Sequence, residues 1–116
     1  MPQDSLLNPG IIIPKELEKW VIGYQNIDRH EFDFYLNNFP ISRVRIKASK
    51  VKKTQKFFAE PNYKLKYNGS ENRYTIPHGV DDDAIEAIFI CLSNFISKGK
   101  VFGFQNNSAY PGTPVL

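Results

Sequence analysis

The sequence predicts a single α+β domain in which one amphipathic helix packs on the apolar face of an antiparallel sheet. The helix is indicated by residues 81–98, whose apolar positions recur at the spacing of one helical face. The sheet is indicated by segments between residues 41 and 76 in which apolar and basic residues alternate. With 116 residues the chain is long enough for one hydrophobic core. We expect an extended segment 1–13, a domain 14–104 and a C-terminal tail 105–116.

The N-terminal part of the domain is expected to be a helical hairpin. Pro14 suits the first turn of a helix, because its missing N–H would have no partner there, and apolar residues follow at helical spacing as far as Gly23. The segment 28–39 is ambiguous, since its apolar residues fit a strand with period two and a helix with period 3.6. Capping-box spacing at its start and the proline that follows it favour the helix. The strand is the alternative.

Five later segments are expected to be strands. They form a sheet of five strands, or of four if the shortest segment takes no part. Three of them alternate apolar with basic residues, as strands do when one face is buried and the other lies in water. The last is apolar enough to lie inside the sheet. The segments are 41–48, 56–59, 62–67, 72–76 and 100–104.

Two of these strands are expected to pair as a hairpin. Asn68 and Gly69 lie between them and form a strong turn signal. A four-residue loop from residue 68 to residue 71 sets Leu65 opposite Tyr74, which puts the apolar residues on one face and the basic residues on the other.

The helix over 81–98 is the element on which the sheet is expected to pack. Three aspartates precede or begin it, and their oxygens can accept the free backbone N–H groups of the first turn. Asp83 and Glu86 have the spacing of a capping box. The only cysteine, Cys91, lies within this helix and is expected to be a small buried apolar residue.

Several classes of site are excluded by the residues that the chain lacks. One cysteine and two histidines cannot form a structural zinc site, and no glycine-rich phosphate loop or nucleophile elbow occurs. No segment approaches about 18 consecutive apolar residues, and the N-terminus has no basic region typical of a signal peptide. We therefore expect no metal, no cofactor, no membrane partner and a cytoplasmic location. The abundance of Ile, Lys and Asn suggests a bacterium or phage as the source.

Positive charge is concentrated in the middle of the chain. The net charge is +3, yet residues 34–70 carry nine lysines and arginines against one glutamate. If the strands belong to one sheet, six basic residues form a continuous patch on the face away from the helix. They are Arg43, Arg45, Lys47, Lys64, Lys66 and Arg73. Such a patch attracts acidic proteins and polyanions, or it merely keeps an exposed sheet face in solution.

The patch favours a small non-enzymatic binding protein that docks a macromolecular partner. Its most concrete form is a bacterial immunity protein or antitoxin that covers a toxin with an acidic surface. The alternative is an RNA-binding protein or a metal-independent ribonuclease toxin, which needs a general base, a general acid and cations around the phosphate. The candidates for these roles are His78, His30, Arg45, Lys64 and Arg73. The expected layout is similar to that of small bacterial ribonuclease toxins, although none of their motifs occurs.

Overall fold

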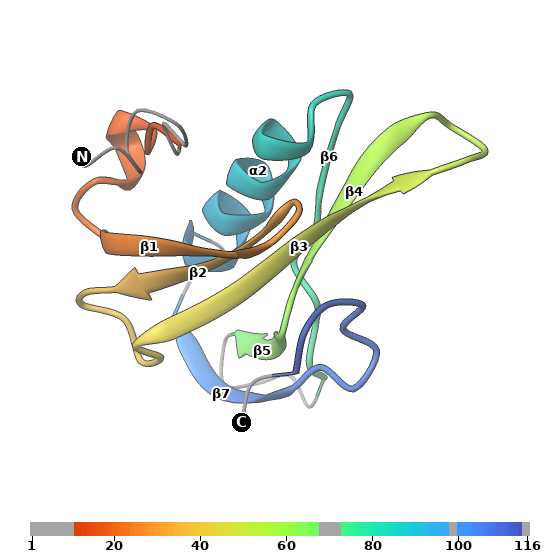
Figure 1. The fold of residues 1–116 in the computed structure, drawn as a ribbon. Coiled ribbons are helices and arrows are strands. Elements are labelled where there is room, and N and C mark those ends of the chain that lie inside the picture. Colours follow the sequence, from red (N-terminus) through yellow and green to blue (C-terminus); the bar gives the residue numbers. More distant parts are fainter. Residues whose placement is uncertain (1–10, 68–72, 98–99, 115–116) are drawn as a thin grey trace.

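The computed structural model describes residues 11–67, 73–97 and 100–114. In these residues one α-helix packs across a five-stranded antiparallel sheet, and a two-stranded ribbon lies at one end of it (Figure 1). The elements are the 3-10 helix η1 (Lys15–Leu17), the strands β1 (Val21–Asp28), β2 (Glu31–Leu36), β3 (Arg43–Val51), β4 (Lys56–Pro61), β5 (Tyr63–Tyr67) and β6 (Gly79–Asp81), the helix α2 (Ala84–Ser97) and the strand β7 (Val101–Asn106). The α+β class is confirmed, with strand order β1-β2-β3-β4-β6 in the main sheet.

The predicted N-terminal helical hairpin is wrong, and a strand hairpin takes its place. Pro14 begins only the single turn η1, after which the chain enters β1 and pairs antiparallel with β2. The strand alternative for 28–39 is the observed one, because a strand buries Phe32, Phe34 and Leu36 together. A helix would have left Phe34 outside the apolar stripe. The tight turn between the two strands is closed at His30, whose φ is 57°.

The core lies between α2 and one face of the main sheet. Phe95, Ile88 and Leu92 of the helix are fully buried, and the apolar residues of β3 that the alternation predicted are buried beneath them. The predicted cap is confirmed, since the backbone N–H of Glu86 donates to Asp83 Oδ2 at 2.9 Å. The helix begins at Ala84, and its expected end at residues 98 and 99 lies outside the described residues.

The strand β6 touches the helix backbone directly. A Cβ atom at Gly79 would collide with the carbonyl oxygen of Ala87 and lie 2.5 Å from the backbone nitrogen of Cys91. Glycine therefore allows β6 to pair with β4 while lying against α2.

The ribbon of β5 and β7 differs from the prediction in two ways. The segment after the loop meets β5 at one bridge, which pairs Leu65 with Thr75 instead of Tyr74. The predicted turn at residues 68–71 lies outside the described residues. The last strand does not lie inside the main sheet. The chain leaves that sheet at Pro61, the end of β4, and the next strand, β5, pairs with β7 in a separate sheet. Phe102 is consequently 54% exposed and Phe104 46% exposed.

Candidate functional site

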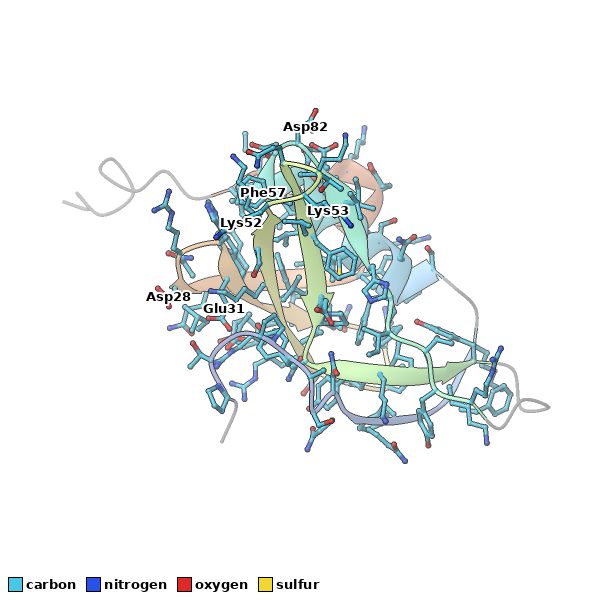
Figure 2. The ribbon with its side chains drawn as sticks, turned by 90° about the vertical axis from the view of Figure 1, so that its right-hand side faces the viewer. Asp28, Glu31, Lys52, Lys53, Phe57 and Asp82 are labelled. Atoms are coloured by element: carbon cyan, nitrogen blue, oxygen red, sulfur yellow. The ribbon has the colours of Figure 1, made fainter. Side chains whose placement is uncertain are left out.

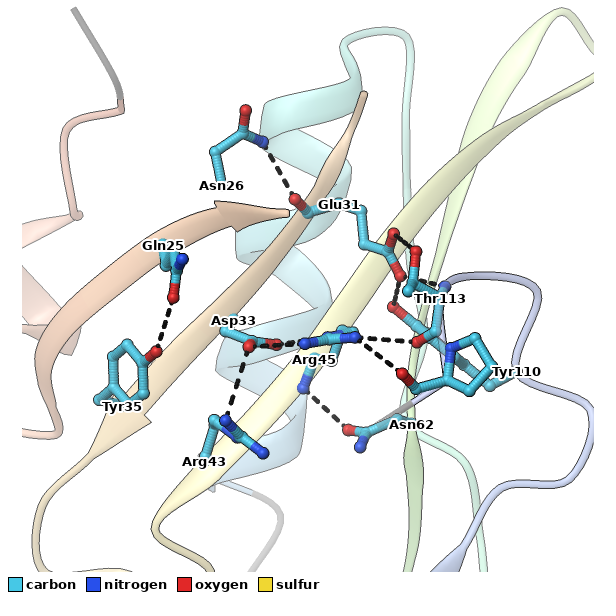
Figure 3. Close-up of polar contacts among 11 residues, drawn as sticks. Gln25, Asn26, Glu31, Asp33, Tyr35, Arg43, Arg45, Asn62, Tyr110 and Thr113 are labelled. Atoms are coloured by element: carbon cyan, nitrogen blue, oxygen red, sulfur yellow. Dashed lines mark hydrogen bonds and ion pairs between the residues drawn. The ribbon is translucent and has the colours of Figure 1, made fainter. Parts of the chain in front are cut away.

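The sheet face opposite α2 carries a buried polar cluster that the C-terminal segment covers (Figure 3). Arg45 of β3 donates from Nε to Asp33 Oδ1 at 2.6 Å and from Nη2 to Asp33 Oδ2 at 2.9 Å. Its Nη1 donates to the carbonyl oxygens of Thr113 and Pro114 at 3.1 and 3.2 Å. The hydrogen bond to Asp33 raises the pKa of Arg45. Arg45 is only 8% exposed, and its hydrogen-bond partners all belong to the chain itself, so it stabilises the fold.

The second carboxylate of this cluster, Glu31, holds the C-terminal segment in place. The Tyr110 hydroxyl donates to Glu31 Oε2 at 2.7 Å. Thr113 donates from its backbone N–H to the same oxygen at 2.6 Å and from its hydroxyl to Glu31 Oε1 at 2.8 Å. Glu31 is fully buried. Burial and the hydrogen bond to Glu31 raise the pKa of Tyr110, so its hydroxyl stays a donor. The predicted surface tail thus packs on the sheet at these residues.

Five of the six predicted patch residues belong to two separate sheets in the structure, and Arg73 belongs to neither. Arg43 and Lys47 lie on β3 on the same face as Arg45, and Arg43 Nη1 is 4.0 Å from Asp33 Oδ2. Lys64 and Lys66 belong to the ribbon, and Arg73 is exposed and lies outside the strands. The six therefore do not form one continuous sheet face, and the buried Arg45 is not available to a partner.

The two histidines of the ribonuclease alternative lie on opposite faces of the main sheet. The His30 ring is 5.2 Å from the Phe57 ring, and the His78 ring is 4.6 Å from the Phe58 ring. Phe57 and Phe58 are consecutive in β4, and consecutive strand residues point to opposite faces. The structure therefore does not bring these histidines together, and it commits Arg45 to Asp33.

A hairpin rich in lysine projects from the main sheet, where β3 and β4 extend beyond the other strands (Figure 1). We call residues 47–56 the basic hairpin, because they carry five lysines and no carboxylate. Lys56 pairs with Asp82 at 3.2 Å. The other four lysines form no ion pair with a residue that the structure describes. The tip is shaped by Gln55, whose side-chain amide donates to the carbonyl oxygen of Lys52 at 2.8 Å.

A hollow of about 350 Å³ lies at the base of the basic hairpin and is lined largely by basic side chains. We call it the basic hollow; its lining residues are Arg29, His30, Lys47, Ala48, Ser49, Lys50 and Phe57. The Lys50 ammonium lies 6.0 Å above the Phe57 ring. Burial, Arg29 and Lys47 lower the pKa of His30 against the opposing effect of Asp83. The positive charges of Arg29 and Lys47 therefore both disfavour protonation of the His30 ring.

Sequence reasoning did not assign Arg29, His30 and Lys50 to one surface. Arg29 and His30 form the turn between β1 and β2. A helix over 28–39 would have included both residues and left no turn there. The backbone bond from the Ala48 N–H to the His30 carbonyl, at 2.9 Å, places this turn beside β3.

Carboxylates lie near Phe57, one of the residues that line the basic hollow. Asp82 and Asp28 lie on either side of Phe57 in Figure 2, and Lys52 and Lys53 lie beside it. Asp81 is paired with Phe57 across β4 and β6. The surface is therefore a cationic centre with an acidic rim.

The described part of the chain contains neither a metal-ligating cluster nor a membrane-spanning helix. Among the described residues no group of three or more His, Cys, Asp or Glu side chains is placed to hold a metal ion. No helix in residues 11–67, 73–97 or 100–114 has both the length and the apolar character needed to cross a membrane. Comparison with protein-family models, with curated proteins and with solved structures finds no match to this chain.

Proposed function

We propose that this chain is a small non-enzymatic binding protein that docks a protein partner with an acidic surface on its basic hollow and basic hairpin. The observation that carries the proposal is the gathering of Arg29, Lys47 and Lys50 around one hollow without an ion pair to any described residue. Like charges held close together repel one another, and a carboxylate from a partner relieves that repulsion.

The acidic rim favours a protein partner over a nucleic acid at this surface. A phosphate backbone is uniformly negative, and it would meet Asp28 and Asp82 on either side of Phe57 (Figure 2). A protein can place carboxylates over the cations and basic side chains over the rim. Phe57 supplies an aromatic contact in the centre, where interfaces concentrate their binding energy.

The most concrete form of the proposal is a bacterial immunity protein or antitoxin that acts in the cytoplasm on a toxin with an acidic surface. The sheet supports this role because Lys47 and Lys50 project from paired strands that pack against the core. A rigid surface loses little conformational entropy on binding. Charge complementarity would also speed encounter with the partner.

The test compares protein capture by two variants with the same change in charge. Arg29→Gln with Lys50→Gln alters the hollow, and Lys64→Gln with Lys66→Gln alters the ribbon as a matched control. Each variant is immobilised, exposed to extract of the source cell, and its bound proteins are quantified by mass spectrometry. The candidate partner is then purified and its dissociation constant measured by titration calorimetry.

We expect one protein to be retained by the wild type and by the ribbon control but to be lost with the hollow variant. Its affinity should fall at least about tenfold with the hollow variant, since a close interfacial charge pair contributes about 1.5 kcal/mol or more. The affinity should also weaken with added salt. Identical capture and affinity for both variants would mean that the basic hollow is only a solvated surface.

A further inference from the structure

The ribbon of β5 and β7 exposes aromatic rings that the core does not use. Phe102 and Phe104 are 54% and 46% exposed, although both lie in a paired strand. The Tyr63 ring lies edge-on to Phe104 at 5.7 Å. Phe104 is paired with Leu65 and shares its face of the ribbon, whereas Phe102 lies at the register shift between β5 and β7 and is the more exposed of the two rings. Exposed apolar side chains that lie together are typical of a binding surface.

The same ribbon is uniformly basic. The described residues of the ribbon, 62–67 and 100–106, and of the segment 73–76 that bridges to Leu65 include Lys64, Lys66, Arg73 and Lys100 and no carboxylate. The Lys100 ammonium lies 5.4 Å above the Phe102 ring, and the Lys64 ammonium lies 6.0 Å above the ring of Tyr74. Cations and rings are therefore interleaved here, which distinguishes the ribbon from the basic hollow with its acidic rim.

The outward face of the ribbon is shaped by a glycine. Leu65 is fully buried, so its neighbours Lys64 and Lys66 point away from the core. Gly103 is paired with Lys66, and a Cβ at Gly103 would lie 3.0 Å from the Tyr74 hydroxyl. The missing side chain leaves room for the Tyr74 hydroxyl against β7. The Tyr74 ring thus lies beside the ribbon with the Lys64 ammonium above it.

We propose that this ribbon binds single-stranded nucleic acid. Bases would stack on Tyr74 and Phe102, while Lys64, Lys66 and Lys100 contact phosphates. Proteins that bind single strands without strong sequence preference combine these two elements, a basic track and rings on which successive bases stack. The surface is distinct from the basic hollow, so this inference does not depend on the proposed protein partner.

Other occupants fit the ribbon less well. A second copy of the chain, related by a two-fold axis, would place its own cations against Lys64 and Lys66, and like charges in an interface disfavour association. A nucleic-acid duplex hides the faces of its bases within the stack, so it would leave the rings of Tyr74 and Phe102 without partners. An acidic protein would satisfy the lysines, but the described ribbon residues offer no carboxylate to the basic side chains that a protein partner also carries.

The experiment measures fluorescence anisotropy of a labelled RNA of about 12 nucleotides, a length within the range of single-strand sites, and of the matching duplex. We expect binding to the single strand in preference to the duplex. The slope of log K against log salt should be about −2 to −3 for three or four phosphate contacts. Lys66→Gln should make that slope less steep by about 0.7. Lys52→Gln in the basic hairpin is the matched control and should leave the slope unchanged.

Ring variants separate stacking from simple charge attraction. Phe102→Ala should weaken binding about tenfold and leave the salt slope unchanged, because stacking on one ring contributes on the order of tenfold or more. Phe102→Trp should restore binding, and its fluorescence should be quenched by the RNA. Ile22→Ala, which removes an exposed apolar side chain outside the ribbon, should have no effect.

Four results would overturn the proposal. Equal affinity for single strand and duplex, or full affinity in both Phe102→Ala and Tyr74→Ala, would show that the rings take no part. A dimer in analytical ultracentrifugation that dissociates in Phe102→Ala would assign the ribbon to a second copy. No binding to RNA at about 50 mM salt would exclude the proposal outright.

Discussion

The hydrogen bond from the Tyr110 hydroxyl to Glu31 should contribute measurably to stability. The bond is 2.7 Å long and its acceptor is a fully buried carboxylate. A hydrogen bond to a charged group contributes about 1.5–3 kcal/mol, and the lower end applies because Tyr110 itself is only half-buried. Tyr110→Phe removes the hydroxyl and keeps the ring. We expect it to lower the free energy of unfolding by about 1.5 kcal/mol.

Two other tyrosines provide an internal scale for this value. The Tyr67 hydroxyl donates to the neutral carbonyl oxygen of Phe95 at 3.0 Å in a buried site, so Tyr67→Phe should cost about 1 kcal/mol. The Tyr35 hydroxyl donates to Gln25 Oε1 at 3.0 Å in an exposed site (Figure 3), so Tyr35→Phe should change stability by less than about 0.5 kcal/mol. The expected order of destabilisation is therefore position 110, then 67, then 35.

The assay is equilibrium unfolding in urea, followed by circular dichroism. For a chain of this size with an m-value near 1.5 kcal/mol/M, Tyr110→Phe should lower the midpoint by about 1 M. A double-mutant cycle with Glu31→Gln should give a coupling energy of at least about 0.5 kcal/mol. If Tyr110→Phe shifts the midpoint no more than Tyr35→Phe does, the C-terminal segment does not hold the buried carboxylate and our reasoning is refuted.

Three further results are expected. Gly79→Ala should destabilise the protein by about 1–3 kcal/mol in the same assay, because its Cβ would collide with the α2 backbone, and an unchanged midpoint would contradict this contact. Cys91 is fully buried and burial raises its pKa, so its thiol should react with Ellman's reagent only after unfolding; rapid reaction of the native protein would show otherwise. Burial, Arg29 and Lys47 lower the pKa of His30 in the folded state, so the unfolded state binds its proton first as the pH falls through about 6.5. Stability should therefore fall as the pH drops below 7, and His30→Gln should reduce that fall, whereas an identical pH dependence of the two proteins would argue against it.

The elements that sequence alone predicts are those whose signals are local and periodic. The apolar stripe of α2 repeats every three or four residues, and the cap joins Asp83 to Glu86, three positions later. The alternation along β3 predicted its buried face, with Val44 and Ile46 both fully buried. These patterns need no knowledge of distant segments.

The segment 28–39 shows why the remainder could not be predicted. Its residues satisfy both a helical and a strand period, so the choice depends on what packs against them. Only pairing with β1 and β3 and burial of Phe34 against Phe89 of α2 decide for the strand, and these contacts join parts distant in the sequence. Local capping signals are weak compared with such burial.

Arg45 was misassigned for the same reason. Alternation along β3 correctly places its side chain on the face away from α2, and an arginine on such a face is ordinarily exposed. Its burial follows from Asp33 on β2 and from backbone carbonyls at residues 113 and 114, which the pattern of one strand cannot reveal. Likewise, the basic hollow required the turn at Arg29 to be placed beside Lys47 and Lys50.

The attachment of the C-terminal segment also determines when this protein can finish folding during synthesis. Thr113, which donates two hydrogen bonds to Glu31, follows it by 82 positions. A ribosome that adds about 5–20 residues per second needs roughly 4–16 s to make that stretch of chain. Until that stretch is complete the Glu31 carboxylate has neither its cover nor its donors and stays hydrated, because burying a charge without partners is strongly unfavourable. Nascent chains that stop before Thr113 would keep this face open to water, which makes them targets for chaperones and proteases.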